Sequence, residues 1–258
     1  MKIIACYNIK GGVGKTTTVV NLAYLAAAQG WRCLIWDLDP QAAASFYFRI
    51  KPKVKQGLQG LLKRKTSLAD IIKATDYANL DIIPADISYR KMELLLADRK
   101  KPKQQLHKLL RPFDTEYDYI FLDCPPGSSL VSASVLHAVD VLLVPVIPTI
   151  LSLRTLEQLL KFSKSQQLSP ICIMPFYSMV DRRKNLHRIM LKNPPKKGPV
   201  FLDACIPYSS EVEQMGVHRA PLASYAGKSR NVMAYRSLLV EMDKRMRDKK
   251  SADAVKLF

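Results

Sequence analysis

The sequence is poor in features that would each indicate a particular class of protein. It contains five cysteines among 258 residues, and none of them forms a C-x-x-C pair. This scatter speaks against a disulfide framework and against a zinc or iron–sulfur site. No apolar run approaches the roughly eighteen residues of a membrane span. The first apolar stretch runs directly into a glycine-rich loop, unlike a signal peptide. We therefore expect a cytoplasmic protein without a membrane-spanning segment.

Acidic residues are also scarce relative to basic ones. The chain has 22 Asp and Glu against 40 Lys and Arg, which gives a net charge of +18. The excess is concentrated in Phe46–Ala69, Arg90–Arg111 and Arg182–Lys250. Clustered positive charge favours a polyanionic partner, and the C-terminal cluster indicates a footprint on the DNA backbone. A solubilising surface is the alternative explanation.

The most informative segment is the glycine-rich loop Lys10–Thr17, which reads K-G-G-V-G-K-T-T. It follows the apolar run Ile3–Tyr7 and precedes a stretch of helical character, Thr18–Ala27. Glycine lets consecutive backbone N–H groups point into one cavity, and the helix N-terminus adds partial positive charge. A polyphosphate is the natural ligand of such a loop. Lys15 is positioned to reach its phosphates, and the Thr16 hydroxyl suits Mg²⁺.

Short apolar runs of strand length recur along the chain and alternate with segments of helix length. The predicted strands are Lys2–Tyr7, Arg32–Trp36, Leu80–Pro84, Tyr117–Asp123, Val139–Val144, Ile171–Phe176 and Phe201–Ile206. The predicted helices include Ser67–Ala74, Ser88–Asp98, Ser128–Ala138, Ser152–Gln166 and Met233–Arg247. This alternation is typical of a mostly parallel sheet. We predict a single α/β domain over residues 1–250, with a sheet of about seven or eight strands flanked by helices on both faces. Residues 251–258 form a short C-terminal tail.

Acidic residues end two of the predicted strands. Asp37 and Asp39 close the second strand and, at positions i and i+2, project from the same face. Asp123 ends the fourth strand in the arrangement called Walker B, whose carboxylate holds the magnesium shell. Ligands of such folds bind at the carboxyl ends of the strands. The sequence therefore predicts that these carboxylates lie beside the glycine-rich loop.

Taken together, these motifs resemble the ParA family of partition and positioning ATPases, within the ParA/MinD group of P-loop NTPases with a variant Walker A motif. Ile9 stands where the general P-loop pattern has its first glycine, and Lys10 matches the second, signature lysine of the variant. The resemblance is carried by Lys10–Thr17, Asp37–Gln41, Asp123–Pro126, Val144–Val146, Ser178–Arg183 and Ile206–Pro207. The segment Tyr208–Pro221 departs from the family pattern, which leaves the identity of the cargo and its adaptor open.

The resemblance implies ATP and Mg²⁺ as ligands and assigns roles to individual residues. Lys15 binds the phosphates, Lys10 reaches the partner's ATP across a homodimer that sandwiches two ATP molecules, and Asp39 orients the attacking water. Thr16, Asp37 and Asp123 serve the magnesium ion. Further nucleotide contacts are expected from Gly11, Gly12, Val13, Gly14, Thr17, Asp181 and Pro207.

The same resemblance implies that the ATP-bound dimer binds DNA without sequence preference and is nucleoid-associated. A ParB-like adaptor or activator protein on the cargo would stimulate its weak ATPase activity. The candidate DNA contacts are Arg188, Lys192, Lys196, Lys197, Arg219, Lys228, Arg230 and Arg236. The cargo could be a plasmid, a chromosome or a large protein assembly.

Two other functions remain open on the sequence. A MinD-like, membrane-associated positioning protein would need an amphipathic C-terminal anchor, and residues 252–258 offer little apolar area, so no stable membrane association is expected. A metabolic or redox ATPase is the other alternative, and the lack of paired cysteines counts against it.

Overall fold

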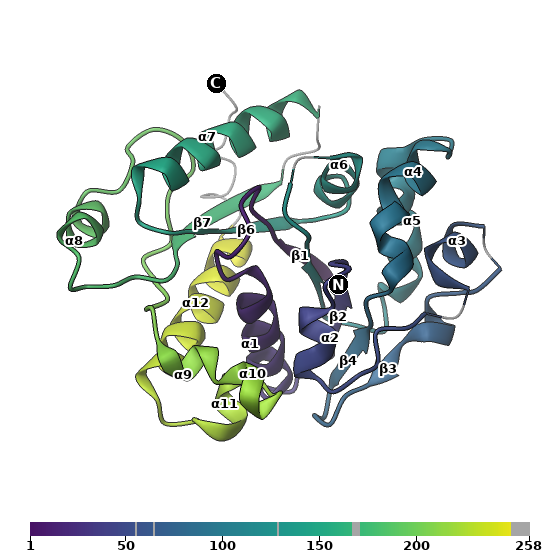
Figure 1. The fold of residues 1–258 in the computed structure, drawn as a ribbon, viewed down its shortest axis with the longest axis horizontal. Helices are drawn as coiled ribbons and strands as arrows, with labels where there is room; N and C mark the ends of the chain where they lie inside the picture. Colours follow the sequence, from purple (N-terminus) through teal and green to yellow (C-terminus); the bar gives the residue numbers. More distant parts are fainter. Residues whose placement is uncertain (55, 64, 128, 167–170, 249–258) are drawn as a thin grey trace.

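The computed structural model describes residues 1–54, 56–63, 65–127, 129–166 and 171–248, so the predicted tail lies outside the described residues. One sheet runs through the centre of the molecule, with helices on both sides (Figure 1). Its seven strands have the order β3-β4-β2-β5-β1-β6-β7, and every pair is parallel except β3 with β4. The strands are β1 Lys2–Cys6, β2 Cys33–Asp37, β3 Lys73–Ala74, β4 Leu80–Ile83, β5 Tyr119–Asp123, β6 Val141–Val146 and β7 Cys172–Tyr177.

The helices divide into two layers. The α-helices are α1 Lys15–Ala27, α2 Ala43–Tyr47, α3 Gly57–Leu62, α4 Met92–Ala97, α5 Gln105–Leu110, α6 Leu130–Leu136, α7 Ile150–Ser165, α8 Asn185–Lys192, α9 Ser210–Glu213, α10 Met215–His218, α11 Leu222–Tyr225 and α12 Arg230–Arg247. Short 3₁₀ turns are Ala69–Ile71, Ile87–Lys91, Pro102–Gln104 and Arg111–Phe113. One apolar core packs α3 to α7 against the sheet, and the other packs α1, α2 and α10 to α12 against its opposite face.

This architecture confirms the predicted fold class, a mostly parallel sheet covered on both faces. Strands β2, β5 and β6 are buried along their whole length, which explains why their sequences are almost continuously apolar. Three helices begin with a side chain that accepts a free amide of the first turn: Ser129 caps α6, Thr149 caps α7 and Ser229 caps α12. None of the helices in the described ranges is long and apolar enough to span a bilayer.

Two predicted elements are wrong. The run Phe201–Ile206 is not a strand. Its Leu202 and Ile206 amides do donate to β7 carbonyls, at 2.8 and 2.9 Å, but no continuous ladder forms, and the next pairing is the isolated bridge between Val180 and Pro207. The amides of Asp203 and Ala204 donate to the Glu241 carboxylate, 2.9 Å each, so they are not available for a ladder with β7.

The predicted helix Ser67–Ala74 is instead a 3₁₀ turn followed by the edge strand β3. The Asp70 side chain accepts the Ser67 amide at 2.9 Å, and the Ser67 side chain accepts the Asp70 amide at 3.3 Å. This reciprocal pattern stabilises the start of a helical turn, which explains why the segment has helical character. The following residues then pair antiparallel with β4, at the end of the sheet.

Candidate nucleotide site

The glycine-rich loop connects the end of β1 to the start of α1. Gly12 and Gly14 have φ values of +68° and +92°, in the region that glycine adopts readily. A Cβ on Gly14 would lie 3.0 Å from the Ser178 hydroxyl, so the position excludes a side chain for a second reason. No side chain caps α1, whose N-cap is Gly14 itself. The amides of its first turn therefore remain available to an anion.

Neighbouring strand ends hold the loop in place. The side-chain amide of Asn8 donates to the carbonyl of Pro145, near the end of β6, at 2.8 Å. The Lys10 amide donates to the Asn8 side chain, 2.9 Å, and the Gly127 amide donates to the Ile9 carbonyl, 3.0 Å. The loop shape is thus fixed by contacts to β6 and to the segment that follows β5, and a bound phosphate would not have to order it.

The two lysines of the loop occupy different environments. The Lys15 side chain is buried, and its ammonium donates to the Lys10 carbonyl at 2.9 Å. Lys10 is exposed at the surface. Lys15 therefore lies within the loop, as a phosphate ligand should, whereas the Lys10 side chain is free to reach a group outside its own subunit.

The loop borders a cavity of about 640 Å³. Six predicted residues line it from the loop itself, namely Gly11, Gly12, Gly14, Lys15, Thr16 and Thr17. Asp39 lines it from the end of β2, and Pro125 and Pro126 line it from beyond β5. The rule that ligands bind at the carboxyl ends of parallel strands thus predicted which segments meet at this cavity. The sequence did not predict four further lining residues, Tyr47, Met179, Val212 and Glu213.

Asp37 is held by a neighbouring serine. It is fully buried at the end of β2, and its carboxylate accepts the Ser45 hydroxyl at 2.7 Å and the Ser45 amide at 2.8 Å. The Asp39 amide donates to its other oxygen at 3.3 Å. Burial raises the pKa of Asp37 to about 6, and the hydrogen bonds from Ser45 oppose that rise. Ser45 was not predicted; the only signal for it is a lone hydroxyl in the small-residue run after Gln41.

Asp123 lies beside Asp37, directly across the β2–β5 ladder. It is fully buried, and neither carboxylate oxygen has a hydrogen-bond partner among the residues that the structure describes. Burial, and after it the charge of Asp37, raises the pKa of Asp123 well above its ordinary value, while the Thr16 hydroxyl and Lys15 lower it. A buried carboxylate in such a position requires a positive partner, and hydrated Mg²⁺ fits this arrangement of oxygen donors.

The residues predicted for the adenine pocket lie beside this cavity. Asp181 and Pro207 line an adjoining cavity of about 730 Å³, together with Tyr208 and Asn231. The Arg183 guanidinium donates two hydrogen bonds to the Asp181 carboxylate, at 2.9 and 3.0 Å, and thereby lowers the pKa of Asp181 to about 2. The adenine assignment of Asp181 and Pro207 remains a prediction.

The candidate DNA contacts form separate groups on the surface. Arg188 and Lys192 belong to α8, and Lys196 and Lys197 follow it; all four are exposed. Of the others, Arg219 and Lys228 lie between α10 and α12, and Arg230 and Arg236 lie on α12. Figure 1 shows α8 on one side of α1 and α12, and α2 and β3 on the other.

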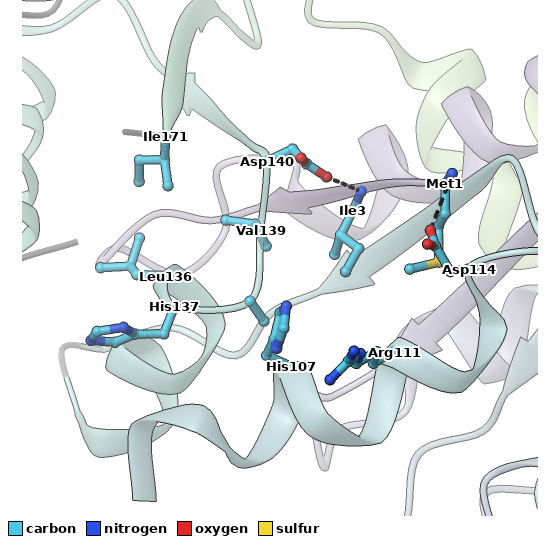
Figure 2. Close-up of a pocket in the computed structure, with 11 residues that line it drawn as sticks. Met1, Ile3, His107, Arg111, Asp114, Leu136, His137, Val139, Asp140 and Ile171 are labelled. Atoms are coloured by element: carbon cyan, nitrogen blue, oxygen red, sulfur yellow. Dashed lines mark hydrogen bonds and ion pairs between the residues drawn. The ribbon is translucent and has the colours of Figure 1, made fainter. Parts of the chain in front are cut away.

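A further cavity lies at the other end of the parallel strands, where β1 begins. It measures about 450 Å³ and is bordered by His107, Arg111 and His137 (Figure 2). The terminal amine of Met1 pairs with Asp114 at 3.5 Å on its rim. None of the predicted site residues lines this cavity, which separates it from the loop.

Comparisons with known proteins agree with this geometry. Residues 1–170 match the family described as an AAA domain. The sporulation initiation inhibitor protein Soj of Bacillus subtilis is 35% identical over 248 residues, which cover 93% of this chain and 98% of Soj. The chromosome partitioning protein ParA of Myxococcus xanthus is 30% identical over 95% of this chain and 88% of its own length. The chain belongs to the ParA family. The resemblance that the motifs indicated is thus confirmed.

The fold of the family member also matches solved structures. A plasmid partition protein of Borrelia burgdorferi, solved with AMPPNP, superposes with a TM-score of 0.82 at 22% identity over 95% of this chain and 99% of that one. At this identity the match concerns the fold. It places the present chain, a partition and positioning ATPase by family, on the P-loop NTPase architecture.

Proposed function

We propose that this ParA-family protein is an ATP-dependent dimerisation switch that binds DNA non-specifically in its ATP state and positions a cargo. A ParB-like adaptor on the cargo would stimulate hydrolysis and so release the dimer from the nucleoid. The observation that carries the nucleotide part of this proposal is Asp123, a buried carboxylate without a partner in the described chain, next to Thr16 of the glycine-rich loop. Such a group is expected where a hydrated cation binds.

The loop cavity supports ATP and Mg²⁺ as ligands. The amides at the start of α1 and the Lys15 ammonium suit a triphosphate, for which Lys15 would exchange its bond to the Lys10 carbonyl. Thr16 would hold Mg²⁺ directly, and Asp37 and Asp123 would hold its water shell. When bound, the ion would neutralise charge that develops on the transferring phosphoryl group.

Hydrolysis requires a positioned water rather than covalent chemistry. Asp39 lines the cavity, and its carboxylate accepts only the Gln41 amide at 2.9 Å among the contacts in the described ranges, so it can also accept a proton of a water molecule. Lys10, exposed at the mouth of the loop, would contact the ATP of the second subunit. This contribution from the partner would couple hydrolysis to dimerisation.

The relatives support a positioning role. Soj and the ParA of Myxococcus xanthus match almost the whole chain, and the latter is named as a chromosome partitioning protein. The net charge of +18 fits a non-specific contact with DNA phosphates. The nature of the cargo, whether chromosome, plasmid or protein assembly, would be set by the adaptor.

The proposal is tested by DNA retention of the purified protein with ATP, with ADP and without nucleotide. Retention should be strong only with ATP and should fall steeply as salt is raised. Asp39→Ala should keep ATP binding, lose turnover and stay on DNA in the ATP-bound state. Equal retention in all three nucleotide conditions would refute the switch, and normal turnover by Asp39→Ala would refute the role of Asp39.

A further inference from the structure

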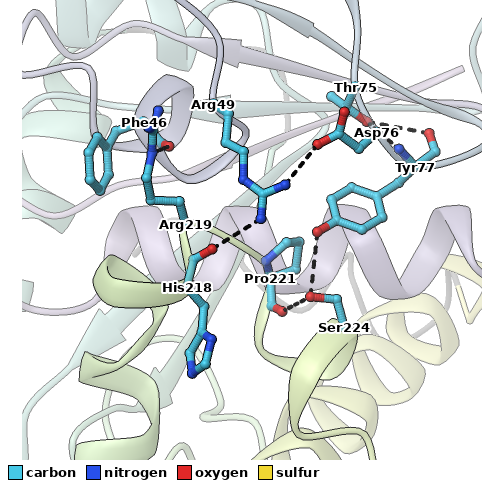
Figure 3. A network of polar contacts seen from close by, with 9 residues as sticks. All are labelled: Phe46, Arg49, Thr75, Asp76, Tyr77, His218, Arg219, Pro221 and Ser224. Atoms are coloured by element: carbon cyan, nitrogen blue, oxygen red, sulfur yellow. Dashed lines mark hydrogen bonds and ion pairs between the residues drawn. The ribbon is translucent and has the colours of Figure 1, made fainter.

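Two arginines from distant parts of the sequence share one surface. Arg49 follows α2, and Arg219 follows α10, 170 positions later. The Arg49 guanidinium donates to the His218 carbonyl at 3.2 Å, and Arg219 Nε donates to the Phe46 carbonyl at 3.2 Å (Figure 3). The Arg219 guanidinium also lies over the Phe46 ring, 4.6 Å from its centroid. These contacts hold the start of the basic segment 49–53 against the C-terminal third of the chain.

Aromatic side chains continue this surface. Tyr77 donates to the Ser224 hydroxyl at 3.4 Å, and the Tyr24 ring packs edge-on against Tyr77 with centroids 4.9 Å apart. We call the set of Arg49, Lys51, Lys53 and Arg219 the basic-aromatic surface, since the Phe46 and Tyr77 side chains lie close to Arg219 and Arg49 (Figure 3).

The chemistry of this surface fits phosphate groups. The Arg49 side chain is 53% exposed, and Lys51 and Lys53 are exposed beside it. The acidic residue that faces Arg49 is Asp76, at 3.3 Å, and it is itself 65% exposed. Arginine presents several donors in a fixed plane, and stacking on an aromatic ring orients that plane without consuming its donors. Exposed, oriented guanidinium groups of this kind bind phosphate oxygens well.

We propose that the basic-aromatic surface binds the phosphate backbone of duplex DNA, and that the basic segment 49–53 is part of the DNA contact. This inference rests on the proposed function and deepens it, because it selects Arg219 from the DNA candidates and adds Arg49, Lys51 and Lys53 to them. The group on α8 lies on the other side of α1 and α12 (Figure 1) and is not part of this surface.

The test measures the affinity of the ATP-loaded protein for a 30-base-pair duplex by fluorescence anisotropy at several salt concentrations. Arg49→Gln should weaken binding about 3- to 10-fold and reduce the slope of log affinity against log salt by about 1. Lys53→Gln should act in the same direction without disturbing the Arg49 contacts. Asp76→Asn should tighten binding, because it removes the acidic residue that faces Arg49.

The matched control is Arg154→Gln on α7, an exposed arginine on the opposite layer of helices, which should bind as the wild type does. Wild-type affinity in both Arg49→Gln and Lys53→Gln would overturn the inference while the switch itself stands. A wild-type protein that binds no duplex with ATP would instead overturn the proposed function. Loss of binding to phosphatidylglycerol vesicles, with duplex affinity unchanged in the same variants, would assign the surface to a membrane and refute it as a DNA site.

Discussion

Replacing Ser45 by alanine should destabilise the protein more than an ordinary buried serine would. The Ser45 hydroxyl donates to Asp37 at 2.7 Å and accepts the Ala85 amide at 2.9 Å, and all three residues are fully buried. A hydrogen bond to a charged group contributes about 1.5–3 kcal/mol, and a buried amide left without an acceptor costs about 1–3 kcal/mol. Ser45→Ala should therefore lower the free energy of unfolding by roughly 3–5 kcal/mol at pH 7.5.

A matched control is available on α6. Ser134 is equally buried, and its hydroxyl donates to the neutral Pro102 carbonyl at 2.9 Å, so Ser134→Ala should cost only about 1 kcal/mol. Urea denaturation of the nucleotide-free proteins compares the two free energies, provided that the m-values agree. If Ser45→Ala costs no more than Ser134→Ala, the hydroxyl does not support Asp37 as the structure indicates.

Three further predictions concern the loop and its carboxylates. Gly14→Ala should abolish ATP binding in a fluorescent-nucleotide titration, because φ is +92° and the new Cβ would lie 3.0 Å from the Ser178 hydroxyl; unchanged affinity would contradict the loop geometry. Lys10→Ala should still bind ATP but fail to form the ATP-dependent dimer in sedimentation, whereas a dimer of normal stability would remove its role across the interface. Folding raises the pKa of Asp37 from 3.8 to about 6, so the folded state ionises this carboxyl less readily than the unfolded state does. As the pH rises from 4 to 7, this group should therefore lower the free energy of unfolding of the nucleotide-free protein by up to about 3 kcal/mol. Urea denaturation at both pH values should show this loss in the wild type relative to Asp37→Asn, and an equal pH dependence of the two would count against it.

The sequence predicted the part of the fold in which local signals agree with the tertiary environment. Strand β1, the glycine-rich loop and α1 were read in order, because a buried apolar run, glycines and a helical stretch each have their own signature. Asp37 and Asp123 were placed together by the rule that parallel strands end at one edge, and the ladder does pair them directly. For these residues, position along the chain is sufficient to locate the side chain.

Most of what the sequence did not predict depends on hydrogen bonds between residues that are not neighbours along the chain. Phe201–Ile206 has the composition of a strand, but Glu241, on a helix some forty positions later, takes two of its amides. The basic segment that begins at Arg49 gives no sign of its contact with His218. Ser45 is similar, because its hydroxyl bonds to a carboxylate eight residues earlier and to a backbone amide after β4. No periodicity in the sequence encodes such pairings.

The nucleotide site holds two buried carboxyl groups whose negative charge is poorly compensated when no ligand is bound. Asp37 and Asp123 are buried side by side with raised pKa values, while the Lys15 ammonium is directed to a backbone carbonyl. This arrangement costs stability without ligand, and a bound cation would relieve it. Because a ligand that binds only the folded state stabilises it by RT ln(1 + [L]/Kd), about 2.7 kcal/mol at 100 Kd, occupancy of the site and stability of the strand ends are linked. Asp39, Ser45 and Tyr47 lie on one continuous segment from β2 to α2, and that segment leads directly to Arg49 on the basic-aromatic surface. This segment is therefore the shortest stretch of chain that joins the nucleotide cavity to the surface for which we propose DNA binding.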